Sequence, residues 1–302
     1  MSVVKEGLVV RATAGFVDVL LPDGVVQCRM RGRLKNVPRT TDLCVIGDRV
    51  RIEEPDEHTR VVVEVLPRMR RFSRRQPGRG AAREDVLIAN LDQLMITFGH
   101  GSPPLKRRLL DRFLVIAEQQ QIRASIVMNK SDLAERGRPE WAELYESLGY
   151  PVLEVSAKTK RGLPTLQTAL AGKISAFVGP SGVGKSSLIN AIVPGLDLDT
   201  ATVSEHHGKG RHTTRVATLH GLPSGGFLAD TPGIRELGTW KLPLEELDRC
   251  FPELAEHRSG CAFRRCSHTH EPHCAVLEAV ARDEIDVRRY ESYVKLREEA
   301  CG

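Results

Sequence analysis

The chain has 302 residues, of which 41% are hydrophobic and 27% are charged, so it is long enough for two or three folded domains and is not compositionally disordered. No segment approaches the roughly 18 apolar residues of a membrane helix, and the first residues lack the apolar core of a signal peptide, so we expect a cytoplasmic protein with no membrane partner. The net charge of +5 favours a polyanionic partner without establishing one.

Residues 1–66 have the pattern of a small all-β domain. Apolar and polar residues alternate in 7–32 around the turn Pro22-Asp23-Gly24, and a second pair of strands is indicated at 44–52 and 59–66. About five short strands in this length fit an OB-fold barrel, which commonly binds nucleic acid, although an SH3-like barrel is also compatible. Phe16 is the only aromatic residue of this part, so base stacking cannot dominate. Phosphate contacts would come from Arg29, Arg31, Arg33 and Lys35.

Residues 67–83 are predicted to form a basic connector. Seven arginines and no acid lie between Arg68 and Arg83, and Pro77, Gly78 and Gly80 interrupt the segment. We therefore expect a flexible linker, which either contacts a polyanion or is simply solvated.

Strands and helices alternate from residue 84 to 240. Continuous apolar runs at 86–90 and 94–99 indicate buried strands, 104–120 is an amphipathic helix, and 123–129 is the next strand. This alternation predicts an α/β fold with a doubly wound parallel sheet and ligand sites at the carboxyl ends of its strands.

Two motifs that read guanine follow strands of this domain. In Asn129-Lys130-Ser131-Asp132, the amide of Asn129 can meet the N7 and O6 edge of guanine, and the carboxylate of Asp132 can accept from N1–H and the exocyclic amine. Because adenine does not offer those two donors together, GTP is favoured over ATP. Ser156-Ala157-Lys158 follows the strand 152–155 and supplies a backbone N–H toward O6.

A phosphate-binding loop comes later in the chain. The strand 174–178 leads into Gly-Pro-Ser-Gly-Val-Gly-Lys-Ser and then a helix, the context of a true phosphate loop. Lys185 should bridge the β and γ phosphates, and the hydroxyl of Ser186 should bind Mg²⁺. The predicted phosphate-binding residues are Gly179, Pro180, Ser181, Gly182, Val183, Gly184, Lys185, Ser186 and Ser187.

The order of these motifs is unusual. In this chain both guanine motifs precede the phosphate loop and Asp230-Thr231-Pro232-Gly233, which is the order of a circularly permuted GTPase. Asp230 would hold Mg²⁺ through water, and the N–H of Gly233 would sense the γ-phosphate. The Gly- and His-rich segment 204–215 would be switch I, with Thr213 or Thr214, preferably Thr214, closing on Mg²⁺.

The residue after the Gly233 position decides how hydrolysis can work. Many GTPases carry glutamine there to orient the attacking water, but this chain has Ile234, which cannot form a hydrogen bond. His212 is the best substitute, because it lies in switch I and can titrate near neutral pH. Arg211 or Arg215 would stabilise charge in the transition state.

Residues 241–302 are predicted to form a helical metal-binding domain. The chain has seven cysteines, too few for a disulfide scaffold, and three of them crowd together near histidines. A closed Cys₃His set that suits Zn²⁺ is supplied by Cys261, Cys266, His268 and Cys274. Four, one and five residues separate these ligands along the chain. Open alternatives are His270 or His273 in place of His268, a contribution from Cys250 or His257, and reduced core cysteines without metal. Helices are expected at 275–283 and 286–300.

The chain resembles the bacterial ribosome small-subunit-dependent GTPase A family over essentially its whole length. The resemblance is carried by the barrel, by the permuted motifs NKSD, SAK, GPSGVGKSS, GKGRHTT and DTPG, and by the segment CAFRRCSHTHEPHC. The resemblance implies an OB-fold, a permuted GTPase domain and a zinc domain. It also implies late maturation of the 30S subunit, contact with 16S rRNA, and GTP hydrolysis to GDP that the small subunit stimulates.

By the same resemblance, the nucleotide residues are 129–132 and 179–187, the zinc ligands are the four named above, and the histidine proposed to be catalytic falls on His212. Arg215 stands where many relatives carry a third threonine. We expect one structural Zn²⁺ per chain, Mg²⁺ with GTP, and a monomer. A large-subunit assembly GTPase and a nucleotide-stabilised RNA scaffold are the competing hypotheses.

Overall fold

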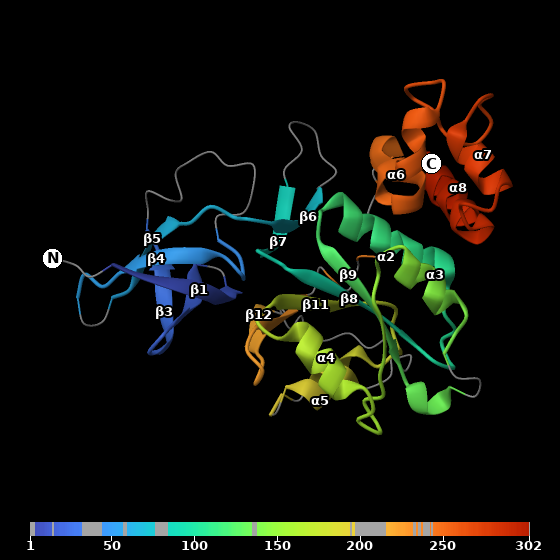
Figure 1. Ribbon diagram of the computed structural model, residues 1–302. Coiled ribbons are helices and arrows are strands. Elements are labelled where there is room, and N and C mark those ends of the chain that lie inside the picture. The colour runs from blue at the N-terminus through green and yellow to red at the C-terminus, as the bar shows by residue number, and fades with distance from the viewer. Residues whose placement is uncertain are drawn as a thin grey trace, which may run out of the picture.

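The computed structural model consists of a β-barrel, a central sheet covered by helices, and a C-terminal helical module (Figure 1). Within the described part of the chain, no helix has both the length and the apolar character needed to cross a membrane. The structure describes residues 4–13, 15–31, 44–56, 59–75, 84–134, 138–193, 195–196, 216–231, 234, 237, 242 and 244–301.

The barrel is built from five strands, β1 (Val4–Thr13), β2 (Phe16–Leu21), β3 (Gly24–Met30), β4 (Arg49–Glu53) and β5 (Val61–Val65). They pair in the order β1-β2-β3-β5-β4, and β4 returns to β1, which closes the barrel. The parallel β3–β5 pair within this closed order is the arrangement of an OB-fold, so it decides against the SH3-like alternative. Alternate residues such as Val9, Val19 and Val62 fill the interior.

The barrel is continuous with the central sheet, which the sequence did not predict. Strand β1 is ten residues long and extends beyond its pairing with β4, which ends at Leu8. There Arg11 and Ala12 pair antiparallel with Thr218 and Ala217 of β12 (Ala217–Gly221). The result is a single 11-stranded sheet.

Part of the predicted connector is a strand. β6 (Arg71–Arg75) pairs antiparallel with β7 (Glu84–Ala89) in a separate two-stranded sheet. The sequence suggested that the run 86–90 is a strand of the parallel sheet. In the structure it belongs instead to this separate two-stranded sheet. The chain turns at Asn90, which has a left-handed φ of 55°. Its side chain accepts from Met69 N (2.8 Å) and donates to Gly47 O (2.9 Å), which ties the connector and the barrel to this turn.

The central sheet has the predicted α/β architecture. Its strands are β8 (Gln93–Gly99), β9 (Arg123–Asn129), β10 (Val152–Glu154), β11 (Ile174–Val178), β12 and β13 (Phe227–Asp230). They lie in the order β10-β9-β8-β11-β13-β12, parallel except for β12. All seven residues of β8 are buried, because both faces of the sheet are covered.

Two pairs of helices cover the sheet. α2 (Arg107–Gln119) and α3 (Trp141–Ser147) lie on one face, and α4 (Leu163–Leu170) and α5 (Lys185–Ile192) lie on the other (Figure 1). The chain runs outward from β8 to β10 and then returns to β11 beside β8. The strand order therefore reverses between β8 and β11, which is where an open α/β sheet binds its ligand.

The C-terminal module packs on α2. It comprises η3 (Leu244–Cys250), α6 (Pro252–His257), η4 (Arg258–Gly260), α7 (Ala275–Ala281) and α8 (Val287–Cys301). Val115 of α2 belongs to the module's core together with Phe251 and Tyr293. A buried ionic contact reinforces this interface, because Arg289 of α8 pairs with both Glu253 of α6 and Asp111 of α2.

Candidate functional site

The loop between β11 and α5 lies at the point where the strand order reverses, and its glycines are required there. Gly179 has a φ of 142°, and a Cβ at this position would lie 2.0 Å from the carbonyl oxygen of Thr97 on β8. Gly184, with a φ of 88°, precedes α5, and its Cβ would lie 2.4 Å from Asn129 Nδ2. At Gly179 a side chain would collide with backbone, and at Gly184 the left-handed φ favours glycine and a side chain would displace Asn129, so the glycines let the loop pack closely against its neighbours.

Lys185 lies folded over this loop. Its Nζ donates to the carbonyl oxygens of Gly179 (2.7 Å) and Pro180 (2.6 Å). Burial lowers the pKa of the Lys185 ammonium to about 8. Ser186 and Ser187 occupy the first turn of α5, half-buried, whereas Ser181 and Gly182 are exposed at the loop and Val183 is buried beneath it. The loop and the Lys185 ammonium thus lie at the N-terminal end of α5, where a phosphate group is favourably bound.

Asn129 joins the three predicted nucleotide motifs. It ends β9 and is only 2% exposed. Its Nδ2 donates to Val183 O (2.9 Å) and Gly184 O (3.3 Å) of the phosphate loop, and its Oδ1 accepts from Ala157 N (3.2 Å). The guanine motif, its companion loop and the phosphate loop are therefore brought together at one edge of the sheet.

The next residue, Lys130, holds a third loop against the site. It adopts a left-handed φ of 60°, and its Nζ donates to Gly182 O (2.8 Å) and to Ser102 O (2.9 Å). The loop that contains Ser102 follows β8 and was not predicted to take part. The Ser-Pro-Pro run after a buried strand was the available signal, since ligand sites form at such strand ends.

Asp132 is held ready to accept hydrogen bonds. The hydroxyl of Ser156 donates to its Oδ1 (2.6 Å), and this bond holds the pKa of the Asp132 carboxyl below its usual range, with the charges of Lys158 and Lys130 adding to the effect. Ser156 Oγ in turn accepts from Thr159 N (3.1 Å). The carboxylate is therefore ionised and oriented, as recognition of guanine donors requires.

The switch residues are only partly described. Asp230 ends β13, and Thr231 is buried with its Oγ1 lacking a hydrogen-bond partner among the described residues. Ile234 is 4% exposed and packs in the core that also contains α2. The candidates His212, Thr214 and Gly233, and the alternatives Arg211, Thr213 and Arg215, lie outside the described residues.

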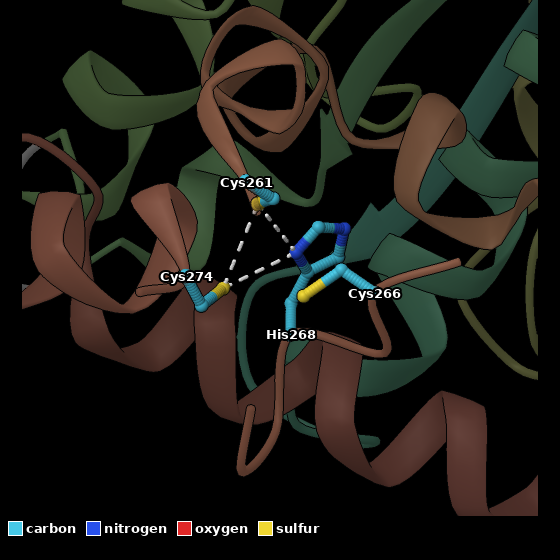
Figure 2. Close-up of side chains that lie close together, drawn as sticks. All are labelled: Cys261, Cys266, His268 and Cys274. Carbon is cyan, nitrogen blue, oxygen red and sulfur yellow. Dashed lines mark hydrogen bonds between the residues drawn. The ribbon is translucent and has the colours of Figure 1, made fainter. Parts of the chain in front are cut away.

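The four predicted metal ligands lie together in the C-terminal module. Figure 2 shows Cys261, Cys266, His268 and Cys274 converging, and their donor atoms all lie within 4.8 Å of one another. The Sγ atoms of Cys261 and Cys274 are 3.8 Å apart, and His268 Nδ1 lies 3.5 and 3.4 Å from them. Tetrahedral coordination at the usual Zn–S and Zn–N bond lengths requires edges of about 3.8 and about 3.6 Å. The cluster therefore has the donors and the size to hold a metal ion.

The alternative metal ligands lie elsewhere. Cys250 is buried in the apolar core, and burial raises the pKa of its thiol to about 12. His257 lies 3.9 Å from a carboxylate oxygen of Glu284. His270 and His273 are exposed. Among the described residues the structure thus brings His268, and no other histidine, to the three sulfurs.

Comparisons with known proteins agree with this geometry. The profile of the RsgA GTPase family matches residues 65–240, and that of the RsgA N-terminal domain matches residues 6–62. The chain is 46% identical to the small ribosomal subunit biogenesis GTPase RsgA of Gemmatimonas aurantiaca, covering 100% of this chain and 99% of that protein. The protein of the same name from Moorella thermoacetica is 41% identical, covering 96% and 95%. The chain belongs to the RsgA GTPase family.

Solved structures of similar proteins extend over the whole chain. YjeQ from Thermotoga maritima has a TM-score of 0.77 at 34% identity and covers 99% of both chains. YloQ, described as a circularly permuted GTPase, has a TM-score of 0.76 at 30% identity and covers 99% of this chain and 95% of its own. The predicted family and permuted α/β fold are confirmed, and as an RsgA GTPase the protein is a GTP-hydrolysing enzyme.

Proposed function

We propose that this protein binds GTP with Mg²⁺ at the reversal point of its sheet and hydrolyses it to GDP and phosphate on the 30S ribosomal subunit, assisting late maturation of that subunit. The observation that carries the proposal is the position of Asn129, whose single amide joins the guanine motif, the companion loop and the phosphate loop. The names of the relatives support the small subunit as the partner.

Each part of the site has a proposed role. Asn129 and Asp132 read guanine, while Lys130, Ser131 and residues 156–158 shape its pocket. Residues 179–187 bind the phosphates. Ser186, Asp230 and Thr214 would hold Mg²⁺, which supplies charge neutralisation between the β and γ phosphates.

Hydrolysis needs a group other than Ile234 to position the attacking water. The burial of Ile234 in the core supports this requirement. We assign the role to His212 in switch I, with Thr214 and the N–H of Gly233 closing around the γ-phosphate. Low intrinsic turnover that rises when the small subunit orders switch I is the expected behaviour.

The C-terminal cluster is proposed to hold one structural Zn²⁺. A closed set of three sulfurs and one imidazole nitrogen leaves no position for substrate, and tetrahedral Cys₃His sets favour zinc. The ion would stabilise a module that otherwise has only a small core.

We assign residues 1–66 to an OB-fold that contacts 16S rRNA, 67–83 to the basic connector, 84–240 to the GTPase domain and 241–302 to the metal domain. In the barrel, Arg29 lies over the ring of Phe16 at 5.4 Å, so this aromatic face is already covered. That contact supports phosphate binding rather than base stacking by the barrel. A cytoplasmic monomer fits this role.

The proposal is tested by measuring GTP hydrolysis by the zinc-replete protein alone, with 30S subunits and with 50S subunits, at several salt concentrations. Strong stimulation by 30S alone is expected. Stimulation by 50S alone would show a large-subunit assembly GTPase, and turnover unaffected by either would show a nucleotide-stabilised RNA scaffold. The Lys185→Ala variant controls for contaminating hydrolases.

A further inference from the structure

The loop between the first two cysteines of the metal cluster, residues 262–265, presents an aromatic ring and two cations to solvent. Phe263 is 50% exposed, and Ala262, Arg264 and Arg265 are exposed as well. Phe263 is the only aromatic among the large hydrophobic side chains that the described part of the chain leaves exposed. We call residues 262–265 the cluster tip.

The cluster tip is short and held at both ends. Cys261 and Cys266, which flank it, both belong to the metal cluster. Ala262 N donates to His273 O (3.3 Å), and the hydroxyl of Tyr293 on α8 donates to Ser267 O (2.8 Å) just beyond the tip. A loop fixed in this way loses little conformational freedom when it binds a partner.

The charges of the cluster tip are uncompensated. Neither Arg264 nor Arg265 forms an ion pair with any residue that the structure describes. Glu271, an acid of the same cysteine-rich segment, accepts from the backbone N–H groups of Ser267 (2.6 Å) and Thr269 (3.2 Å), so its carboxylate is directed into its own loop. Arg264 and Arg265, the two residues that follow Phe263, therefore place unpaired positive charge next to an exposed aromatic ring.

We propose that the cluster tip binds an unpaired RNA base, with Phe263 stacked on the base and with Arg264 and Arg265 on the adjacent phosphates. Aromatic rings that stack on bases, combined with cations that contact the phosphates, are a recurring way in which proteins hold single-stranded RNA. A protein partner would instead favour a contiguous apolar patch, whereas the tip offers a single ring. The inference rests on the proposed action at the small subunit and names the part of its RNA that the metal domain contacts.

The test is the affinity of the zinc-loaded protein for purified 30S subunits in the presence of a non-hydrolysable GTP analogue. Phe263→Ala is expected to weaken binding by about 5- to 150-fold, the usual cost of losing one stacked base. Phe263→Trp, which keeps a stacking face, should bind as tightly as the original protein. Val287→Ala is the matched control, because Val287 is 54% exposed in the same domain and should not affect binding.

The arginines are tested by salt dependence and by chemical probing. Replacing both Arg264 and Arg265 by alanine should reduce the slope of log affinity against log salt by about 1.5, since two phosphate contacts are lost. Base-specific probing of 16S rRNA should show an unpaired base that the original protein protects and Phe263→Ala does not. Metal content and GTP affinity, measured for each variant, must equal those of the original protein.

The outcomes separate this inference from the proposed function. If the original protein does not bind 30S subunits, the proposed function fails. If it binds and Phe263→Ala binds equally well with the same protected bases, the cluster tip is not an RNA contact and the function stands. If Phe263→Ala weakens binding while every base protection persists and only a contact to a ribosomal protein is lost, the partner is protein and the inference is wrong.

Discussion

The Nε2 atom of His268 lies 3.5 Å from Oδ2 of Asp248, while Nδ1 of the same ring faces the sulfurs of Cys261 and Cys274. Arg258 donates to the same Asp248 oxygen at 2.7 Å. A carboxylate in this position keeps the proton on Nε2 and leaves the lone pair of Nδ1 for a metal, a common arrangement around metal-binding histidines. Asp248 therefore orients the one imidazole of the cluster.

Replacing Asp248 by alanine is expected to lower zinc affinity by about 10- to 100-fold, because His268 loses the partner that fixes its tautomer and ring orientation. The measurement is competition with a chromophoric chelator. Glu256→Gln removes an acid that is exposed on α6 and should leave the affinity unchanged. Equal zinc affinities for the Asp248 and Glu256 variants would contradict the orienting role.

Arg289 makes a buried polar contact between the metal domain and α2. Its side chain is 2% exposed, its Nε lies 2.7 Å from Glu253, and it pairs with Asp111, which also accepts from Tyr145 Oη (2.6 Å). Arg289→Ala should lower the free energy of unfolding by about 3 to 5 kcal/mol, because two carboxylates remain buried without a counter-charge. Urea denaturation of the zinc-loaded protein measures this loss.

The neighbouring Arg288 provides the control for that experiment. It is exposed on α8, so Arg288→Ala should change the free energy of unfolding by less than about 0.5 kcal/mol. A loss below about 1 kcal/mol for Arg289→Ala would mean that Asp111 and Glu253 find solvent or other partners.

The parts of the fold with local signals were predicted well. The phosphate loop needs glycine at fixed offsets, and the Cys₃His set needs soft donors close together, so both are visible in a short window of sequence. α2 and α8 were predicted from periodicity and agree to within a few residues.

The contacts that depend on distant segments were not predicted. The pairing of β1 with β12 joins residues about 200 positions apart, and neither strand carries a pattern that identifies its partner. The run 86–90 reads as a buried strand in either sheet, because apolar character does not say which neighbour covers it. Asp248 and Arg289 look like ordinary surface charges until the tertiary fold buries them.

Nucleotide affinity should fall as pH rises above about 8. In the free protein the pKa of Lys185 is lowered to about 8 by burial, so above that pH the ammonium must regain a proton to bind phosphate. Affinity for a GTP analogue with Mg²⁺ should drop by up to about tenfold per pH unit. Over the same range the folded state binds fewer protons than the unfolded state, so this group makes the free energy of unfolding rise with pH.

The comparison with Lys185→Arg isolates that effect. Lysine and arginine are not interchangeable at such a site, so the Lys185→Arg variant should bind nucleotide more weakly at pH 7. Because arginine keeps its charge throughout, the nucleotide affinity of the variant should not show the fall above pH 8 that deprotonation of lysine causes. The same comparison corrects for ionisation of guanine itself near pH 9. Parallel pH profiles for the two proteins would show that Lys185 does not titrate in this range.

Asp132→Asn should exchange GTP for XTP as the preferred nucleotide. The carboxylate, oriented by Ser156 Oγ at 2.6 Å, is expected to accept from N1–H and the exocyclic amine of guanine. An asparagine amide would point its N–H at the exocyclic amine of guanine, so two donors would face each other and neither would have an acceptor. GTP affinity should therefore fall by at least about 100-fold. Xanthine has a carbonyl in place of that amine, and the amide can donate to it.

Ser156→Ala is the matched variant for this exchange, since it removes the hydroxyl that orients Asp132 and keeps the carboxylate. It should weaken GTP binding by about fivefold, the cost of one ordinary hydrogen bond, while GTP remains preferred over XTP. Titration of both variants with fluorescent GTP and XTP analogues measures the two preferences. If Asp132→Asn binds GTP as the original protein does, the carboxylate does not read guanine and specificity must come from the amide of Asn129 and the backbone of residues 156–158.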